Sequence, residues 1–268
     1  MPFYMDPAGV LRARELEQWP WLAHGFSTRA AGDLGRETGS GAQQRFLKAA
    51  GASGMALRTL RQIHSSIVLV AEETTEGQAG DSLVARRAGL LVGIRTADCL
   101  PVLLVDVRRR GVAAAHAGWR GAARRVVQKT AGEMRALGSR PGDLHAAIGP
   151  GIRACCFEVG PEVLEEFFSQ FSDAGQFCVP EPPNPAWTRL PLQVMTHPER
   201  MRPLDRERGR VDLAAATRAQ LIAAGVPPGQ IYDSGLCTAC DPCRFHSYRR
   251  DRQAAGRMLA VIGARVRA

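Results

Sequence analysis

Short apolar runs, separated by polar and glycine-containing turns, dominate the first half of the chain. They predict buried strands at residues 67–70, 90–95, 100–106 and 112–115. A fifth run, at 145–152, predicts a strand that ends in a Gly-Pro turn. Later segments place apolar residues at helical spacing. They predict helices at 121–137, 160–171 and 211–226, while the pattern at 254–265 fits a helix or a strand.

The order of these elements indicates a mixed α/β architecture in which helices cover sheets. Seven prolines lie between residues 179 and 203 and predict an irregular loop at about 179–210. Only about 60 residues follow that loop, fewer than most domains contain. We therefore expect residues 1–268 to form one domain with a long excursion.

The net charge of +9 raises the question of a nucleic-acid partner. The arginines are scattered along the chain, however, and with nine Phe and three Tyr the sequence offers few aromatic groups for base stacking. An anionic small substrate explains the sign of the charge as well. We expect a small-molecule partner and no nucleic acid.

The first residues lack the cationic start and long apolar run of a signal peptide, and no apolar run approaches the ~18 residues of a membrane span. We expect a cytoplasmic protein with no membrane partner, present as a monomer or weak homo-oligomer. The seven cysteines are then expected to be reduced.

Candidate chemistry gathers around "TADCLPVLLVDVRRRGVAAAHAGWRG". If residues 108–111 form the turn of a hairpin, His116 lies roughly opposite Val102, and Cys99 lies at the same end of the sheet. His64, which follows Gln62, is expected at the start of a strand. The three side chains form an N/N/S donor set that suits zinc and leaves a fourth position for water or substrate. Taken one at a time, each of these three residues could instead be an ordinary buried residue with no metal-binding role.

Two further segments have chemical potential. In "HAGWRG", glycines flank Trp119 and Arg120 just before a predicted helix, an arrangement that suits anion binding. In "CTACDPCRFH", the close spacing is typical of a zinc knuckle or an iron–sulfur site. The residues concerned are Cys237, Cys240, Cys243 and His246. A reduced, tightly turned loop is the alternative there, and we expect the adjacent pair Cys155–Cys156 to be structural.

Several motifs together resemble one known family. They are "RQIHSSIVLV", "ADCLPVLLVD", "HAGWRGAARRVV", "AAIGPGIRACCFEVG" and "LCTACDPCRFHSYRRDRQAAGRMLAVI". In this order they are similar to the laccase-domain, or YfiH-type polyphenol-oxidase-like, family over about residues 20–265. The resemblance implies an α+β fold with α/β/β/α layers and mixed sheets. It maps the family's metal ligands and catalytic residues onto His64, Cys99 and His116, with zinc as the ion and copper as the alternative.

The resemblance also implies activities. Family members carry out phosphorolysis of adenosine, inosine, guanosine and methylthioadenosine, and deamination of adenosine. Substrate and anion binding would then involve Arg29, Gln62, Trp119 and Arg120. The chain departs from the family around "STRAAGDLGRETGS", where Arg29 is kept but the segment is shorter. Asp81 matches a family acidic position without an evident role.

We expect a zinc-dependent purine nucleoside phosphorylase with adenosine deaminase activity. The rival enzyme is a peptidoglycan editing factor that hydrolyses a seryl-muramyl nucleotide, in which Cys99 could act as a free thiolate. A polyphenol oxidase (laccase) ranks last, since six histidines, two of them at the centre, are few for several copper sites. A non-catalytic nucleic-acid-binding module is the alternative of another class.

Overall fold

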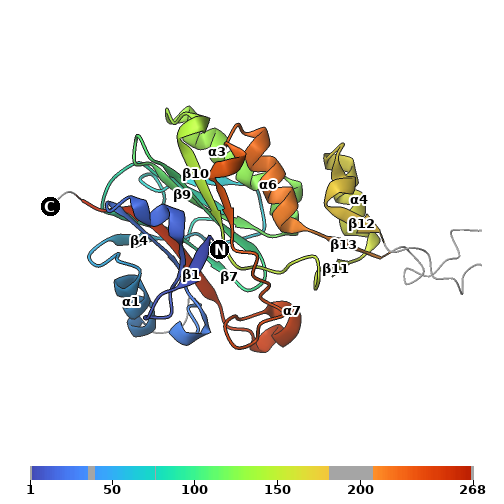
Figure 1. Cartoon of the computed structure of the whole chain (residues 1–268), viewed down its shortest axis with the longest axis horizontal. Coiled ribbons are helices and arrows are strands. Elements are labelled where there is room, and N and C mark those ends of the chain that lie inside the picture. The colour runs from blue at the N-terminus through green and yellow to red at the C-terminus, as the bar shows by residue number, and fades with distance from the viewer. Residues whose placement is uncertain (1, 36–39, 76, 181–207, 267–268) are drawn as a thin grey trace, which may run out of the picture.

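The computed structural model describes residues 2–35, 40–75, 77–180 and 208–266, and its largest features are two six-stranded sheets (Figure 1). The first sheet has the order β1 (Phe3–Met5), β2 (Leu11–Ala13), β3 (Leu22–Phe26), β15 (Met258–Ala264), β7 (Leu90–Thr96) and β4 (Ala56–Arg58). The second has the order β14 (Ile231–Asp233), β10 (Leu144–Ile148), β8 (Leu100–Asp106), β9 (Val112–Ala117), β6 (Ser82–Ala85) and β5 (Val68–Val70).

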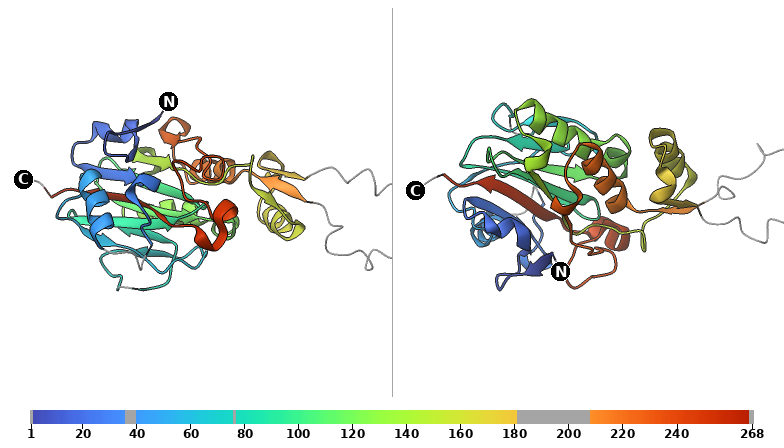
Figure 2. Two further views of the ribbon diagram at one scale, coloured as in Figure 1. Left: turned by 90° about the horizontal axis from the view of Figure 1, so that it is seen from below. Right: turned by 45° about the horizontal axis from the view of Figure 1, so that its top comes forward.

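Helices and a small third sheet complete the described part of the chain. The helices are α1 (Ser40–Ala49), α2 (Trp119–Ala123), α3 (Val126–Ala136), α4 (Pro161–Gln170), α6 (Leu213–Ala223) and α7 (Tyr248–Asp251). The third sheet has the order β11 (Glu158–Val159), β13 (Gly209–Val211) and β12 (Cys178–Pro180). Together with α4 it forms a lobe at one end of the molecule, away from the C-terminus (Figure 2).

Strand β8 shows why the two large sheets lie in the middle of the fold. Leu103 and Val105 are buried against residues of the first sheet such as Phe26. On the opposite face, Val102 and Leu104 are buried in the cluster that holds α3 and α6. A strand buried on both faces needs a continuous apolar run, which "LPVLLVD" supplies.

The outer face of the first sheet is covered by α1, whose Phe46 packs with Val261 of β15. The layers are therefore helix, sheet, sheet and helix, and both large sheets mix parallel with antiparallel pairs. The expected α+β fold with α/β/β/α layers is confirmed. Among the helices of the described ranges, none has the length and apolarity needed to cross a bilayer.

The predicted strands in the first half are confirmed within a few residues, and the ambiguous segment at 254–265 proves to be a strand, β15. Asp212 caps the N-terminus of α6, because its side chain accepts hydrogen bonds from the N–H groups of Ala214 and Ala215. The prediction of a single helix at 121–137 is wrong, because the segment forms two helices, α2 and α3. Arg125 has a φ of 61°, a left-handed conformation that separates α2 from α3.

Three other expectations need correction. His116 pairs with Pro101 and not with Val102, so the hairpin register is shifted by one residue. His64 lies in a bend before β5 and does not start the strand. The expected irregular loop at 179–210 is wrong at its two ends, where β12 and β13 pair with each other. The rest of that loop, residues 181–207, lies outside the described residues.

Candidate metal centre

Three side chains from separate segments converge at one end of the second sheet. Cys99 lies just before β8, His116 lies in β9, and His64 comes from the bend before β5. Each offers one ligand atom, and these atoms all lie within 4.8 Å of one another. The two imidazole rings meet edge to face, with centroids 4.9 Å apart. The structure thus brings together the three residues that the sequence singled out.

A buried carboxylate, that of Asp81, orients both histidines. Its Oδ1 accepts a hydrogen bond from Nδ1 of His116 at 2.8 Å and another from the backbone N–H of His64 at 3.0 Å. Its Oδ2 accepts hydrogen bonds from the backbone N–H and the hydroxyl of Ser65, both at 2.6 Å. Because Nδ1 of His116 is engaged by Asp81, Nε2 is the nitrogen left for a metal ion, an arrangement common in metal sites.

The sheet explains how Asp81 reaches its position. It directly precedes β6, and β6 pairs with β9 so that Ser82 lies opposite Ala115. One step further, the backbone N–H of His116 donates to the carbonyl of Asp81 at 2.8 Å. Sequence reasoning assigned no role to Asp81. The signal available was the match of Asp81 to a family acidic position. Its function depends on a strand pairing that local patterns do not reveal.

The bend that carries His64 is held in an uncommon conformation. His64 has a φ of 57°, a region that non-glycine residues seldom adopt. Hydrogen bonds from consecutive N–H groups of Ile63, His64 and Ser65 to Asp81 stabilise this bend. The same carboxylate therefore fixes the backbone of one imidazole and the ring of the other.

The cluster is also organised electrostatically. Burial opposes ionisation of Cys99, yet the positive charge of His116 and hydrogen bonds from His116 and His64 outweigh it and lower the pKa of Cys99 to about 6. Burial likewise disfavours charged His116, but Cys99 and Asp81 outweigh it and raise the pKa of His116 to about 9. For Asp81, hydrogen bonds from His116 and Ser65 outweigh burial and lower the pKa to about 2.

The donor set and the space around it fit a metal ion. Two imidazole nitrogens and one thiolate are ligands that zinc prefers, and three protein ligands leave a coordination position open. Gly118 keeps this space clear. A Cβ at that position would lie 2.8 Å from Sγ of Cys99 and 3.1 Å from Cδ2 of His64. Any larger residue would press on the ligands themselves.

The three candidate ligands line a cavity of about 1010 Å³. Five arginines contribute to its wall, namely Arg61, Arg95, Arg249, Arg252 and Arg257. The acidic residues there are Asp33 and Asp98. Aromatic groups also line it, among them Trp119, Phe157 and Tyr248. The cavity therefore combines a basic wall with flat apolar surfaces, which suits an anionic or nucleoside-like molecule.

The expected anion-binding residues divide into two groups. Gln62 and Trp119 line the cavity. Gln62 bonds the backbone of Arg95 in both directions, donating to its carbonyl at 2.7 Å and accepting from its N–H at 2.8 Å. Gln62 thus helps to position the backbone of Arg95 in the cavity wall. Both polar atoms of its side-chain amide are used in these two hydrogen bonds.

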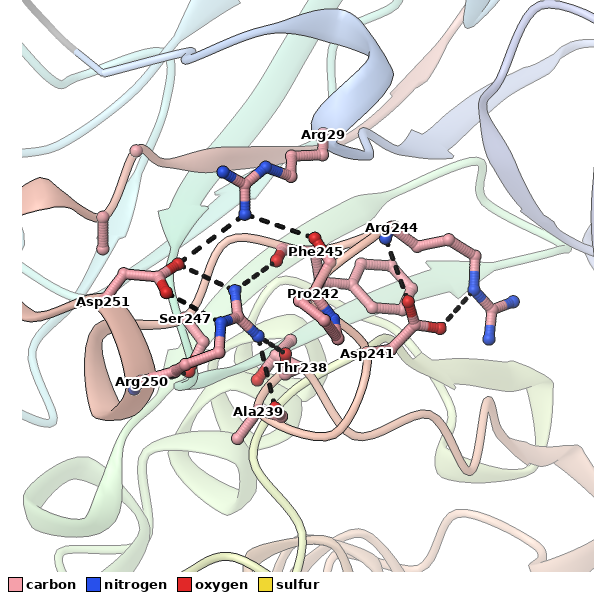
Figure 3. A network of polar contacts seen from close by, with 12 residues as sticks. Arg29, Thr238, Ala239, Asp241, Pro242, Arg244, Phe245, Ser247, Arg250 and Asp251 are labelled. Atoms are coloured by element: carbon pink, nitrogen blue, oxygen red, sulfur yellow. Dashed lines mark hydrogen bonds and ion pairs between the residues drawn. The ribbon is translucent and has the colours of Figure 1, made fainter.

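Arg29 and Arg120 are not among the residues that line this cavity. Arg29 lies 3.7 Å from the carboxylate of Asp251 and donates to the carbonyl of Pro242 at 3.2 Å (Figure 3). Arg120 is exposed, and its guanidinium carbon lies 4.3 Å from the ring centroid of Trp119. Either side chain would have to move to contact a molecule beside the metal ligands.

The structure regroups the expected second cysteine site. Cys237 and Cys240 do come together, but their partners are Cys155 and Cys156. Cys243 and His246 are not part of this cluster, and His246 packs against Gly256 instead.

Comparison with known proteins gives consistent results. The family described as multi-copper polyphenol oxidoreductase laccase matches residues 28–265. A protein of Deinococcus radiodurans named purine nucleoside phosphorylase is 37% identical over 269 residues, which cover 95% of this chain and 92% of that protein. A protein from an unknown prokaryotic organism, named adenosine deaminase RL5, is 36% identical over 75% of this chain and 72% of its own length. The crystal structure of YlmD from Geobacillus stearothermophilus superposes with a TM-score of 0.77 at 27% identity, covering 99% of both chains.

Replacing Asp81 with asparagine should weaken metal binding. The substitution keeps the size of the side chain but removes the charge and one of the accepting oxygens that orient His116 and the His64 bend. We expect zinc affinity to fall by roughly 10- to 100-fold, as for other partners of metal-bound histidines. Competition with a chromogenic chelator measures this.

Asp106→Asn is the matched control, because Asp106 is equally buried and accepts N–H bonds from Arg108 and Arg109 at the hairpin turn. A folded Asp81→Asn protein with unaltered zinc affinity would contradict the role assigned to Asp81.

Cys99 should be unusually reactive once the protein has been treated with a chelator. Because its pKa is lowered to about 6, the thiolate is present above that pH, so alkylation should rise with an inflection near pH 6. An ordinary cysteine has its inflection near ~8.5. Iodoacetamide labelling followed by peptide mass spectrometry separates Cys99 from the other thiols.

His116→Gln removes the positive charge that favours the thiolate, so the inflection should move to higher pH in that variant. Added zinc should protect Cys99 in the wild type. Identical profiles for the two proteins would show that His116 does not control the thiol.

Proposed function

The chain belongs to the family described as multi-copper polyphenol oxidoreductase laccase, and on that premise we propose that it is a zinc-dependent purine nucleoside phosphorylase that also deaminates adenosine. The substrates would be adenosine, inosine, guanosine and methylthioadenosine, with phosphate as the second reactant. The names of the relatives support this proposal, since they include a purine nucleoside phosphorylase and an adenosine deaminase.

One observation carries the proposal. His64, Cys99 and His116 place three ligand atoms within 4.8 Å of one another on the wall of a large basic cavity. These residues would hold a zinc ion, which supplies Lewis acidity that makes water reactive near neutral pH. Asp81 engages Nδ1 of His116 and so would leave Nε2 as the nitrogen that binds the ion. The thiol of Cys99 ionises readily beside His116, as a thiolate ligand requires.

The cavity wall would bind the two substrates. Arg61 and Arg252 line it and, within the described part of the chain, their guanidinium groups form no ion pair or side-chain hydrogen bond. They are therefore our candidates for phosphate, for which arginine has matching forked donors. Trp119, Phe157 and Tyr248 would provide the flat surfaces on which a purine base packs.

A second candidate function rests on the hydrogen-bonded series Cys99, His116 and Asp81. A thiol, an imidazole and a carboxylate in this order also form the arrangement of a thiol nucleophile with its base and an orienting acid. Hydrolysis of a seryl-muramyl nucleotide would use that arrangement, and the basic wall would suit the phosphates of such a substrate. Activity that persists after the metal is removed, and is lost on alkylation of Cys99, favours this alternative.

The residues do not fit a multi-copper centre. Among the described residues, the clusters with ligand spacing contain two histidines, His64 and His116. His145 instead contacts the hydroxyl of Tyr232, and the ring of His24 accepts a hydrogen bond from the backbone of Ala13. We therefore propose no laccase chemistry for this chain.

Incubation of the zinc-loaded protein with adenosine and phosphate should release adenine and ribose 1-phosphate, measured by liquid chromatography. The ribose 1-phosphate should equal the sum of adenine and hypoxanthine, because deamination converts part of the adenosine to inosine. Cys99→Ala should lower the rate by more than about 100-fold, because loss of a direct ligand exceeds the effect of losing an outer partner. Arg61→Ala and Arg252→Ala should raise KM for phosphate more than they lower kcat.

Arg124→Ala serves as the control, since Arg124 is exposed and does not line the cavity. If the zinc-loaded wild-type protein turns over none of the four nucleosides, the proposal is wrong.

A further inference from the structure

Four cysteines from two distant segments meet outside the metal centre described above. Cys155 and Cys156 lie in the turn between β10 and β11, and Cys237 and Cys240 lie between β14 and α7. Their four sulfur atoms all lie within 4.8 Å of one another. Sγ of Cys240 is 3.5 Å from that of Cys155 and 3.2 Å from that of Cys156.

The topology explains this meeting. Strands β10 and β14 are parallel neighbours, with Ile148 paired to Asp233. The segments that follow two parallel strands leave the sheet at the same edge. Here they stay together, because Gly151 forms a bridge with Cys237 and its carbonyl accepts a hydrogen bond from the N–H of Thr238 at 3.1 Å. The cysteines are therefore brought together by the fold and not by proximity in the sequence.

We propose that Cys155, Cys156, Cys237 and Cys240 bind one structural zinc ion. Four thiolates form a closed tetrahedral site, the usual arrangement for structural zinc, whereas the catalytic set of three leaves a position open. With Zn–S bonds of about 2.3 Å, tetrahedral geometry separates the sulfurs by roughly 3.8 Å. Two of the separations, 3.2 and 3.5 Å, are somewhat shorter than this distance and none of the others exceeds 4.8 Å, so small side-chain rotations would bring the four sulfurs to it.

Other uses of four cysteines fit less well. An iron–sulfur cluster places several atoms between its thiolates and so needs sulfurs further apart than these. Disulfides would require exclusive pairs with S–S bonds of about 2.05 Å, but Cys240 contacts both Cys155 and Cys156. Cys155 and Cys240 are exposed, so an ion can enter from solvent.

The ion would brace one wall of the catalytic cavity. Next to the cluster, the hydroxyl of Thr238 donates to Oδ1 of Asp98 at 2.7 Å. The backbone N–H of Arg249 donates to the other oxygen of Asp98 at 2.6 Å. Asp98 directly precedes the ligand Cys99, and Arg249 lines the cavity. Fixing the Cys237–Cys240 segment therefore helps to fix the backbone that presents Cys99.

The rest of this segment is secured by arginine. The guanidinium of Arg250 donates to the carbonyls of Thr238 at 2.9 Å and Ala239 at 3.2 Å, and to that of Phe245 at 2.9 Å (Figure 3). Arg250 is itself paired with Asp251. Arg250 thus holds the backbone carbonyls of this segment. The thiols of Cys237 and Cys240 remain available for an ion.

Metal analysis of the full-length protein tests the proposal. Protein produced with zinc should contain about two zinc ions per chain, one per site. His64→Ala should lose the ion of the His64, Cys99 and His116 site and retain the ion of the four cysteines. Cys240→Ser should lose the ion of the four cysteines and retain the first. The double variant should contain none. Cys243→Ser is the matched control, because Cys243 is exposed, lies three residues away and is outside the cluster, and it should retain both ions.

A second measurement covers the case in which Cys240→Ser fails to fold. In cobalt-loaded His64→Ala protein, the absorption should be that of a tetrahedral site with four thiolates, and a mercurial reagent should release the ion. Retention of both ions by folded Cys240→Ser would overturn the proposal. The proposal would also be overturned if cobalt-loaded His64→Ala protein showed no absorption from thiolate ligands. Two disulfides among these four cysteines in freshly purified protein would overturn it as well. Because these readouts do not involve nucleosides, failure of the proposed nucleoside phosphorylase activity would not affect the zinc result. Absence of the second zinc ion would likewise not disprove that activity.

Discussion

The geometry of the candidate site depends on the buried carboxylate of Asp81. It bonds the ring of His116 and the backbone of the bend that carries His64, so one side chain determines the relative position of two ligands. A buried carboxylate without such partners would be costly, and here its partners outweigh that cost and keep it ionised. The negative charge in turn favours a positive centre beside it, whether a protonated His116 or a bound cation.

The two-sheet architecture places this carboxylate where it can act. β8 and β9 are the central strands of the second sheet, buried on both faces, and Cys99 and His116 lie at one end of them. Because these strands are tightly packed, the candidate ligands have little freedom to move, which is the condition for a preformed metal site. Helix α7, which carries Arg249, lines the cavity from the C-terminal part of the chain and is tied back through Asp98. The proposed second ion would strengthen this tie from its outer side.

Much of this could be predicted from the sequence, because much of it is local. Continuous apolar runs indicated buried strands, and the turn at 108–111 was enough to bring Cys99 and His116 to one edge, with a register error of one residue. What could not be predicted depends on non-local pairing or on side-chain direction. The bend at His64 has a positive φ that is stabilised by the distant Asp81. Arg29 and Arg120 carry the right charge for an anion, but Asp251 and Trp119 hold them outside the cavity lining. The meeting of two cysteine pairs depends on the parallel pairing of β10 with β14.

The central claim is that Asp81 orients the imidazole of His116 and fixes the bend that carries His64, so that the two histidines and Cys99 bind a single ion. Anomalous diffraction at the zinc absorption edge, from crystals grown with zinc, tests it most directly. The account predicts a peak bonded to His64, Cys99 and His116 at about 2.0–2.3 Å, with Nδ1 of His116 still bonded to Asp81. A fully zinc-loaded crystal in which no ion contacts His116 would contradict it.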